Sequence, residues 1–153
     1  MNDQISIPAG DAKTEELEFI SLEEAAAMTS GTRVTFIPGI QAMYAEALKN
    51  ICFVKEISLI RAIHPMMGID ESTGLDRQAK LYELTSQTSL PTMFHNEERP
   101  RNVWVEQLAL AEEIGAKDTP KLIPRDFKQR MEVIGLCALT VAEDGLVWNM
   151  RNL

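Results

Sequence analysis

The sequence predicts a mixed α/β fold, and its order of strand-like and helical segments indicates this. Arg33–Ile37 is rich in β-branched and aromatic residues, a helical period follows over Ala42–Glu56, and Ser58–Ile63 again favours a strand. A proline then opens the short apolar segment Thr92–His95, and a polar turn separates it from a further helical period over Val103–Ile114. The first three segments form a βαβ unit, in which the two strands run parallel with a right-handed crossover.

Size and composition restrict the class of protein. The chain has 153 residues, enough for one domain or slightly more, and its 45% hydrophobic content is ordinary for a soluble globular protein. The net charge of -8 argues against nucleic acids and anionic membrane surfaces as partners, because both require basic patches. No apolar run is long enough to span a membrane, and residues 1–18 lack the basic start of a secretory signal. We therefore expect a cytoplasmic protein.

The segments around the βαβ unit carry recognisable start and stop signals. We expect residues 1–17 to form a disordered lead, because they contain many polar and acidic residues and few large apolar ones. Ser21 and Glu24 fit a capping box that opens a short helix ending near Gly31. A loop over residues 64–76 precedes a second short helix, Asp76–Thr85. The apolar side of that helix is expected to carry Ala79, Leu81 and Tyr82.

The C-terminal half is predicted to contain one further strand and two longer helices. Glu98–Arg101 is expected to return across the tight turn as a short fourth strand. Gly115 marks the end of the following helix, on which Trp104, Leu108 and Ala111 share one face. After a linker, Asp126 and Gln129 give a second capping signal for a long helix through Val141. The two cysteines, Cys52 and Cys137, have no CxxC or CxxH spacing, so we expect buried, reduced thiols.

In this order the elements resemble the N-terminal domain of glutathione transferases, which is a thioredoxin-like fold. The resemblance runs from about Arg33 to the C-terminus, and the residues that carry it are Glu46–Ile51, Leu90–Pro91, Glu97–Glu106 and the tail Ala142–Arg151. It implies a thioredoxin-like domain with an added N-terminal helix over residues 18–116. Residues 117–153 would then form a linker and the first one or two helices of a truncated all-α domain.

The resemblance also implies a binding site for glutathione as co-substrate. Leu90, preceding Pro91 in an expected cis peptide bond, would pair its main chain with the cysteinyl part of glutathione. Arg101 and Asn102 would hold the γ-glutamyl carboxylate at a helix N-terminus, which is a natural anion site. The family usually has an acid or glutamine followed by serine there, so this chain departs at both positions. Asn102 is alternatively a structural N-cap of the helix.

The resemblance further implies a side chain that activates the glutathione thiol. Family members place a serine, tyrosine or cysteine near the start of the first helix, where its side chain meets the sulfur. Ala42 occupies that place in this chain, which leaves the hydroxyl of Tyr44 as the candidate catalytic group and Gln41 as a further polar candidate. Tyr44 is alternatively a packing residue. His64 and His95 have no acidic or cysteine neighbours at ligand spacing, so no metal site is expected.

Two functions remain open from the sequence. The first is a homodimeric glutathione transferase-like enzyme that conjugates glutathione to a small electrophile. The second is a non-catalytic thioredoxin-fold module for protein association, in which the glutathione site is degenerate. Leu90–Pro91 and the order of the elements favour the enzyme, whereas Ala42 and Arg101 favour the association module.

Overall fold

The computed structural model describes residues 18–66, 68–69, 71–72, 74, 76–141 and 145–146. The lead predicted over residues 1–17 lies outside the described residues, as does nearly all of the C-terminal tail that carries part of the family resemblance. Within the described part of the chain, no helix has the length and apolar character needed to cross a membrane.

A single four-stranded sheet forms the centre of the described structure, in the order β1-β3-β2-β4. Strands β1 and β2 both run parallel to β3, whereas β4 runs antiparallel to β2. The bounds are Phe19–Ile20 for β1, Thr32–Phe36 for β2, Leu59–Ile63 for β3 and Met93–His95 for β4. The predicted βαβ unit is confirmed as β2, α2 and β3, and the arrangement is a thioredoxin-like α/β fold.

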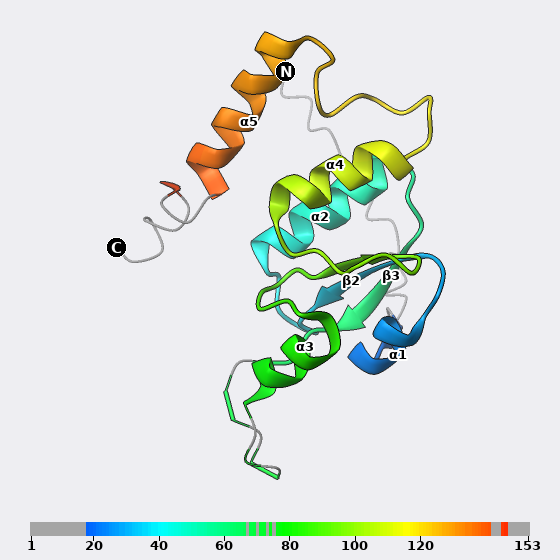
Figure 1. The fold of residues 1–153 in the computed structure, drawn as a ribbon, viewed down its shortest axis with the longest axis vertical. Helices are drawn as coiled ribbons and strands as arrows, with labels where there is room; N and C mark the ends of the chain where they lie inside the picture. The colour runs from blue at the N-terminus through cyan, green and yellow to red at the C-terminus, as the bar shows by residue number, and fades with distance from the viewer. Residues whose placement is uncertain are drawn as a thin grey trace, which may run out of the picture.

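Five helices occur in the described residues and lie on both faces of this sheet (Figure 1). Helices α2 and α4 lie side by side on one face, α1 and α3 lie on the other, and α5 stands apart beyond a long connection. The bounds are Leu22–Ala27 for α1, Met43–Val54 for α2, Arg77–Thr85 for α3, Trp104–Ile114 for α4 and Phe127–Val141 for α5. The long helix predicted after Asp126 is therefore present, and its start is marked by the Gln129 amide donating to Asp126 Oδ1 at 2.9 Å.

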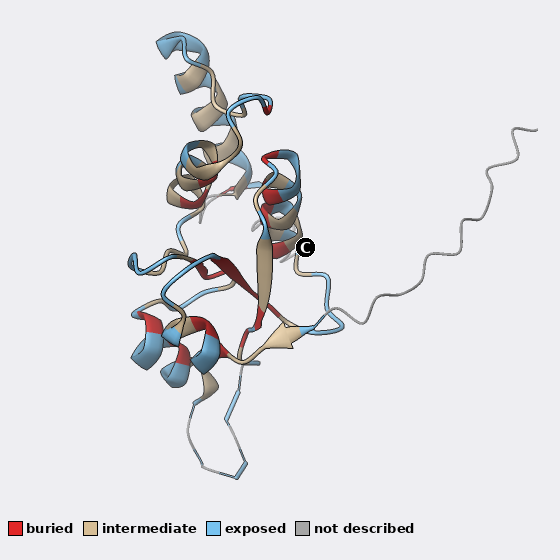
Figure 2. Ribbon diagram, turned by 90° about the vertical axis from the view of Figure 1, so that its right-hand side faces the viewer, coloured by how far each residue is buried: buried red, intermediate tan, exposed pale blue. Residues whose placement is uncertain are grey.

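Two apolar clusters pack the sheet against its helices. Figure 2 shows that the buried residues gather on the sheet and on the helices that cover it. The cluster beneath α2 consists of Val34, Phe36, Ala45, Leu48, Cys52 and Met93. The cluster beneath α1 and α3 consists of Leu22, Ala25, Ala62, Leu81 and Phe94. Both cysteines are free thiols, as expected, but only Cys52 is buried, because Cys137 lies on the partly exposed helix α5.

Three local expectations need correction. Glu98–Arg101 is not a strand, because the pairing is limited to one bridge in which Met93 and Arg101 exchange hydrogen bonds of 2.8 and 2.9 Å. Pro100 has no amide to extend that ladder. The side of α3 that faces the core is also narrower than predicted, since Leu81 is buried but Ala79 is exposed and Tyr82 is 59% exposed. Strand β1 was not predicted, because a two-residue strand has too short a pattern to recognise.

The linker after α4 is held against the domain by a buried lysine. Lys55 is completely buried at the end of α2, and its Nζ donates to Pro120 O at 3.1 Å and lies 3.7 Å from Glu112 Oε1. Burial raises the pKa of Glu112, but the Leu122 amide, Lys55 and Lys121 outweigh it, so the pKa is lowered overall. Pro120 and Leu122 of the linker are therefore tied to α2 and α4 through Lys55 and Glu112.

Candidate functional site

The loop before β4 is the place where the predicted site residues meet the core. Its Leu90–Pro91 peptide bond is cis, as predicted. Leu90 is half-buried and packs against the apolar cluster beneath α2, and Ala42 at the start of α2 packs against the same cluster. The proline loop and the N-terminal end of α2 therefore border one region, at the end of the sheet where α4 also begins (Figure 1).

On the C-terminal side of Leu90, the main chain is held by a buried threonine of β2. The amide of Thr92 donates to Thr35 Oγ1 at 2.8 Å, and Thr92 O accepts from the Thr35 amide at 2.9 Å. The Thr92 hydroxyl reaches back across the loop and donates to Ser89 O at 2.9 Å. These three bonds fix the loop on both sides of Leu90.

A buried glutamine of α4 completes this frame. Gln107 is 4% exposed, and its Nε2 donates to Pro91 O at 2.8 Å and to Arg101 O at 3.0 Å. The sequence analysis missed this residue, although its position carried a signal. Gln107 stands three residues after Trp104 and four before Ala111, which places a polar side chain on the predicted apolar stripe of the helix.

The main chain of Leu90 itself stays open within this frame. Among the described residues, no hydrogen bond engages its amide or its carbonyl, and Leu90 is only half-buried. A main-chain amide and carbonyl side by side can pair with an extended peptide, as a strand does at a sheet edge. Within the described part of the chain, the loop therefore leaves the main-chain donor and acceptor of Leu90 without a partner.

The start of α2 offers amide groups but little side-chain chemistry. Ala42 is the N-cap and provides no side-chain acceptor, so the first-turn amides retain their partial positive charge. Gln41 is exposed beside it. Tyr44 is half-buried, and its hydroxyl oxygen is buried from solvent. The two predicted residues, Gln41 and Tyr44, thus lie at one end of α2 with Ala42 between them, and the Tyr44 hydroxyl is directed into the protein.

The start of α4 differs from the expectation in one respect. Val103, not Asn102, is the N-cap, so the alternative that Asn102 caps this helix is wrong. Asn102 lies one residue earlier and donates its Nδ2 to Ser89 Oγ at 2.8 Å, which joins it to the proline loop. Arg101 is turned away into the preceding turn, where its Nη2 pairs with Glu98 Oε2 at 2.5 Å. Asn102 is therefore at the candidate site, and Arg101 is engaged beside it.

The two histidines are integrated into the hydrogen-bonding of the sheet. His64 is 3% exposed, and its Nδ1 lies 3.2 Å from Thr35 Oγ1. Burial lowers the pKa of His64 to about 4, which keeps the ring neutral at pH 7. His95 Nδ1 lies 3.0 Å from Thr32 Oγ1 on the opposite end of β2. Among the described residues, no group of three or more histidine, cysteine, aspartate or glutamate side chains could hold a metal ion.

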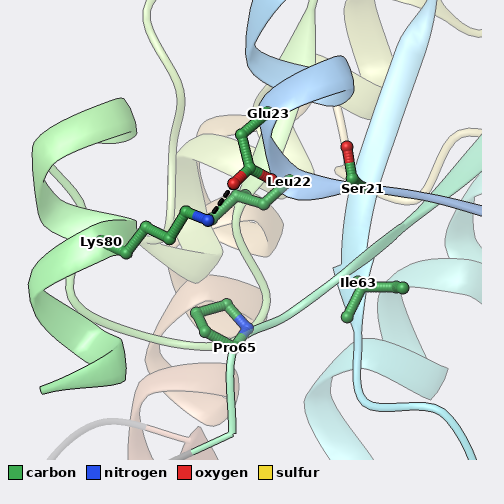
Figure 3. Close-up of a pocket in the computed structure, with 6 residues that line it drawn as sticks. All are labelled: Ser21, Leu22, Glu23, Ile63, Pro65 and Lys80. Atoms are coloured by element: carbon green, nitrogen blue, oxygen red, sulfur yellow. Dashed lines mark ion pairs between the residues drawn. The ribbon is translucent and has the colours of Figure 1, made fainter. Parts of the chain in front are cut away.

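A shallow hollow occurs elsewhere, between α1, the end of β3 and α3 (Figure 3). Its volume is about 180 Å³, which is smaller than typical ligand pockets. Glu23 and Lys80 form an ion pair across it, and this pairing lowers the pKa of Glu23. None of the predicted site residues lines this hollow. The lining residues are Ser21, Leu22, Glu23, Ile63, Pro65 and Lys80.

Comparison with known proteins supports the fold. No family model and no curated protein matches the sequence. Among solved structures, the chain is similar to Leishmania TDR1, described as a unique trimeric glutathione transferase, with a TM-score of 0.51 and 14% sequence identity. The match covers 71% of this chain and 22% of that chain, so the chain spans about a fifth of the length of TDR1. The similarity shows a fold of the glutathione transferase type, consistent with the strand order described above.

Proposed function

We propose that this protein binds glutathione at the proline loop and presents its thiol to a small electrophile. The observation that carries the proposal is the open main chain of Leu90, which is framed by the hydrogen bonds of Thr92 and of Pro91. Glutathione is an extended tripeptide, so its cysteinyl amide and carbonyl can pair with one amide and one carbonyl of a protein. The likeness in fold to a glutathione transferase supports the same ligand.

Polar groups near Leu90 can bind the γ-glutamyl part of glutathione. Asn102 uses its Nδ2 toward Ser89 and so keeps its amide oxygen for the α-ammonium group of the γ-glutamyl part. The uncapped start of α4 supplies main-chain amides for the adjacent carboxylate. Arg101 would contribute only after leaving Glu98, and Gln41 lies exposed at the start of α2. We therefore assign the main role in carboxylate binding to the helix start and Asn102.

Conjugation should be slow in this protein. The N-terminal end of α2 stabilises a nearby thiolate by about 0.3–1 kcal/mol, which lowers a thiol pKa by less than about one unit. A hydroxyl that donates to the sulfur would add roughly 1.5–3 kcal/mol. Tyr44 is the candidate for that role, and its buried hydroxyl oxygen would have to turn toward the ligand. We also propose that the protein is a cytoplasmic homodimer. Its thioredoxin-like domain would end at residue 116, and the linker and the helices of the second part would begin at residue 117.

Titration of the ¹⁵N-labelled protein with glutathione tests the proposal. We expect the Leu90 amide signal to shift with glutathione and equally with S-methylglutathione, since main-chain pairing does not need the free thiol. Replacing Asn102 with alanine should weaken binding by about fivefold or more, through loss of one hydrogen-bonding side chain. Asn50→Ala, on the exposed side of α2, is the matched control and should bind as the wild type does. Absence of any shift at millimolar glutathione would refute the proposal.

Helix α5 favours the second candidate function, a module for protein association. None of its residues is buried within the described part of the chain. Four large apolar side chains are half or more exposed on it: Phe127, Met131, Leu136 and Leu139 at 68, 50, 65 and 71%. Apolar exposure of this extent marks association surfaces. If calorimetry with glutathione gives neither heat nor a thermal shift, while sedimentation shows association that Leu139→Glu abolishes, the association module is the better account.

A further inference from the structure

We propose that Thr35 and His64 are positioning residues, which hold the proline loop so that the main chain of Leu90 faces its ligand. The proposal rests on the proposed function for its ligand, because glutathione is the probe of that main chain. Neither residue would touch glutathione. Both would act through the amide of Thr92, two residues beyond Leu90.

Thr35 and Thr92 face each other where the pairing of β2 and β4 ends at the proline loop. Val34 pairs with Met93, so the register of β2 and β4 continues to Thr35 and Thr92. Facing pairs in an antiparallel ladder alternate between pairs that exchange two main-chain hydrogen bonds and pairs that exchange none. Met93 gives its amide and carbonyl to Arg101, away from β2, so the next pair, Thr35 and Thr92, stands at an exchanging position. Here the Thr35 amide donates to Thr92 O at 2.9 Å, but the Thr92 amide donates to the hydroxyl of Thr35 at 2.8 Å. A side chain has therefore taken the place of a main-chain acceptor.

This substitution matters because of the proline that precedes Thr92. Pro91 has no amide proton, so the Thr92 amide is the first main-chain donor after Leu90. Thr35 and Thr92 are both completely buried, so no water replaces the hydroxyl if it is lost. The Thr92 amide consequently depends on a single hydroxyl oxygen for its hydrogen bond.

His64 orients the Thr35 hydroxyl. Thr35 Oγ1 receives the Thr92 amide proton, and its own proton needs an acceptor. The Nδ1 of His64 lies 3.2 Å away, and the His64 amide is itself held by Phe36 O at 2.8 Å. The geometry assigns Nδ1 as the acceptor and Nε2 as the protonated nitrogen of a neutral ring. His64 thus directs the lone pairs of the Thr35 hydroxyl toward Thr92.

Matched threonine variants test the inference. Thr35→Val removes the hydroxyl without changing the size of the side chain, whereas Thr35→Ser keeps it. Thr85→Val is the control, because Thr85 is also buried and its hydroxyl bonds Leu81 O at 2.6 Å on α3. We expect Thr35→Val to weaken glutathione binding by about tenfold, while Thr35→Ser and Thr85→Val stay within about twofold of the wild type. Wild-type affinity in Thr35→Val, or an equal loss in Thr85→Val, would overturn the proposal.

Measurements without ligand separate this inference from the proposed function. In Thr35→Val, the Thr92 amide should exchange faster with solvent, and the imidazole ¹⁵N signals of wild-type His64 should show an unprotonated Nδ1. If the wild type binds no glutathione, the proposed function fails, and the amide exchange still decides whether Thr35 holds the loop. If Thr35→Val does not fold, His64→Leu takes its place and should weaken glutathione binding. His64→Asn, which retains a hydrogen-bond acceptor, should bind more tightly than His64→Leu. A protonated Nδ1, or an unchanged exchange rate of the Thr92 amide, would overturn the inference.

Discussion

Replacing Gly115 with alanine should destabilise the domain, although the backbone of this residue is ordinary for any amino acid. Gly115 ends α4 with φ -66° and ψ 156°, so glycine is not needed for its conformation. It is needed for space, because a Cβ atom there would lie 2.5 Å from Lys55 Cε and 2.9 Å from both Lys55 Cβ and Ala111 O. Contacts of this length force a neighbour to move.

The magnitude follows from which neighbour can move. Ala111 O belongs to the helix backbone, and Lys55 is fully buried with its Nζ donating to Pro120 O at 3.1 Å. Overpacking at a site that cannot relax costs about 1–3 kcal/mol. The lower chain entropy of alanine in the unfolded state returns about 0.4–1 kcal/mol. We therefore expect Gly115→Ala to lower the free energy of unfolding by about 1–2 kcal/mol.

Urea denaturation followed by circular dichroism measures this change, and the chain offers a control of opposite sign. Gly135 lies inside α5, and apart from its chain neighbours and the backbone of its own helix, no described atom lies within 4 Å of the place where its Cβ would be. Gly135→Ala should therefore leave the domain intact and favour the helix by up to about 1 kcal/mol. If Gly115→Ala unfolds at the same or higher urea concentration than the wild type, the tight packing of Lys55 over Gly115 is not real.

Three further predictions concern single side chains. The pKa of His64 is about 4 in the folded state against 6.5 for an unperturbed histidine, so the unfolded chain binds more protons between these pH values. The free energy of unfolding, measured by urea titration, should therefore fall by up to about 3 kcal/mol from pH 6.5 to 4, and by less in His64→Asn. Burial raises the pKa of Cys52 to about 11, so a thiol reagent at pH 8 should label Cys137 first and Cys52 only on unfolding; rapid labelling of folded Cys52 would contradict its burial. Because the Tyr44 hydroxyl oxygen is buried, Tyr44→Phe should change the rate of glutathione conjugation by less than about tenfold, and a larger loss would show that the hydroxyl reaches the thiol.

Local signals in the sequence were sufficient for most of the secondary structure. The helix over Met43–Val54 and the strand over Leu59–Ile63 follow from the period of their apolar residues. The capping box of α1 is present, with the Glu24 amide on Ser21 Oγ at 3.1 Å and the Ser21 amide on Glu24 Oε2 at 2.7 Å. Gly115 ends α4 as predicted. These features depend on neighbours within a few positions, so the sequence alone contains their cause.

The candidate site was predicted in part, because its residues come from separate elements. The sequence identified Leu90–Pro91 and the neighbourhood of Asn102, since a proline before a strand and a polar residue before a helix are local patterns. It did not show that Asn102 reaches Ser89 instead of capping α4, because an N-cap is chosen by backbone geometry. The roles of Gln41, Tyr44 and Arg101 stay predictions.

The sequence by itself determined the α/β class, the βαβ unit and the approximate places of the helices, because hydrophobic period, capping residues and prolines act over a few positions. The end of α1 was wrong, since the helix ends at Ala27 and not near Gly31. The tertiary structure alone decided which polar side chains serve the loop. Gln107 and Thr35 are ordinary polar residues in a helix and a strand, and they become structural only where Pro91 O and the Thr92 amide need partners. Such pairings join residues more than fifteen positions apart. A buried main-chain group without a hydrogen bond costs free energy, so the folded protein supplies a partner from a distant position. No local sequence pattern identifies that partner.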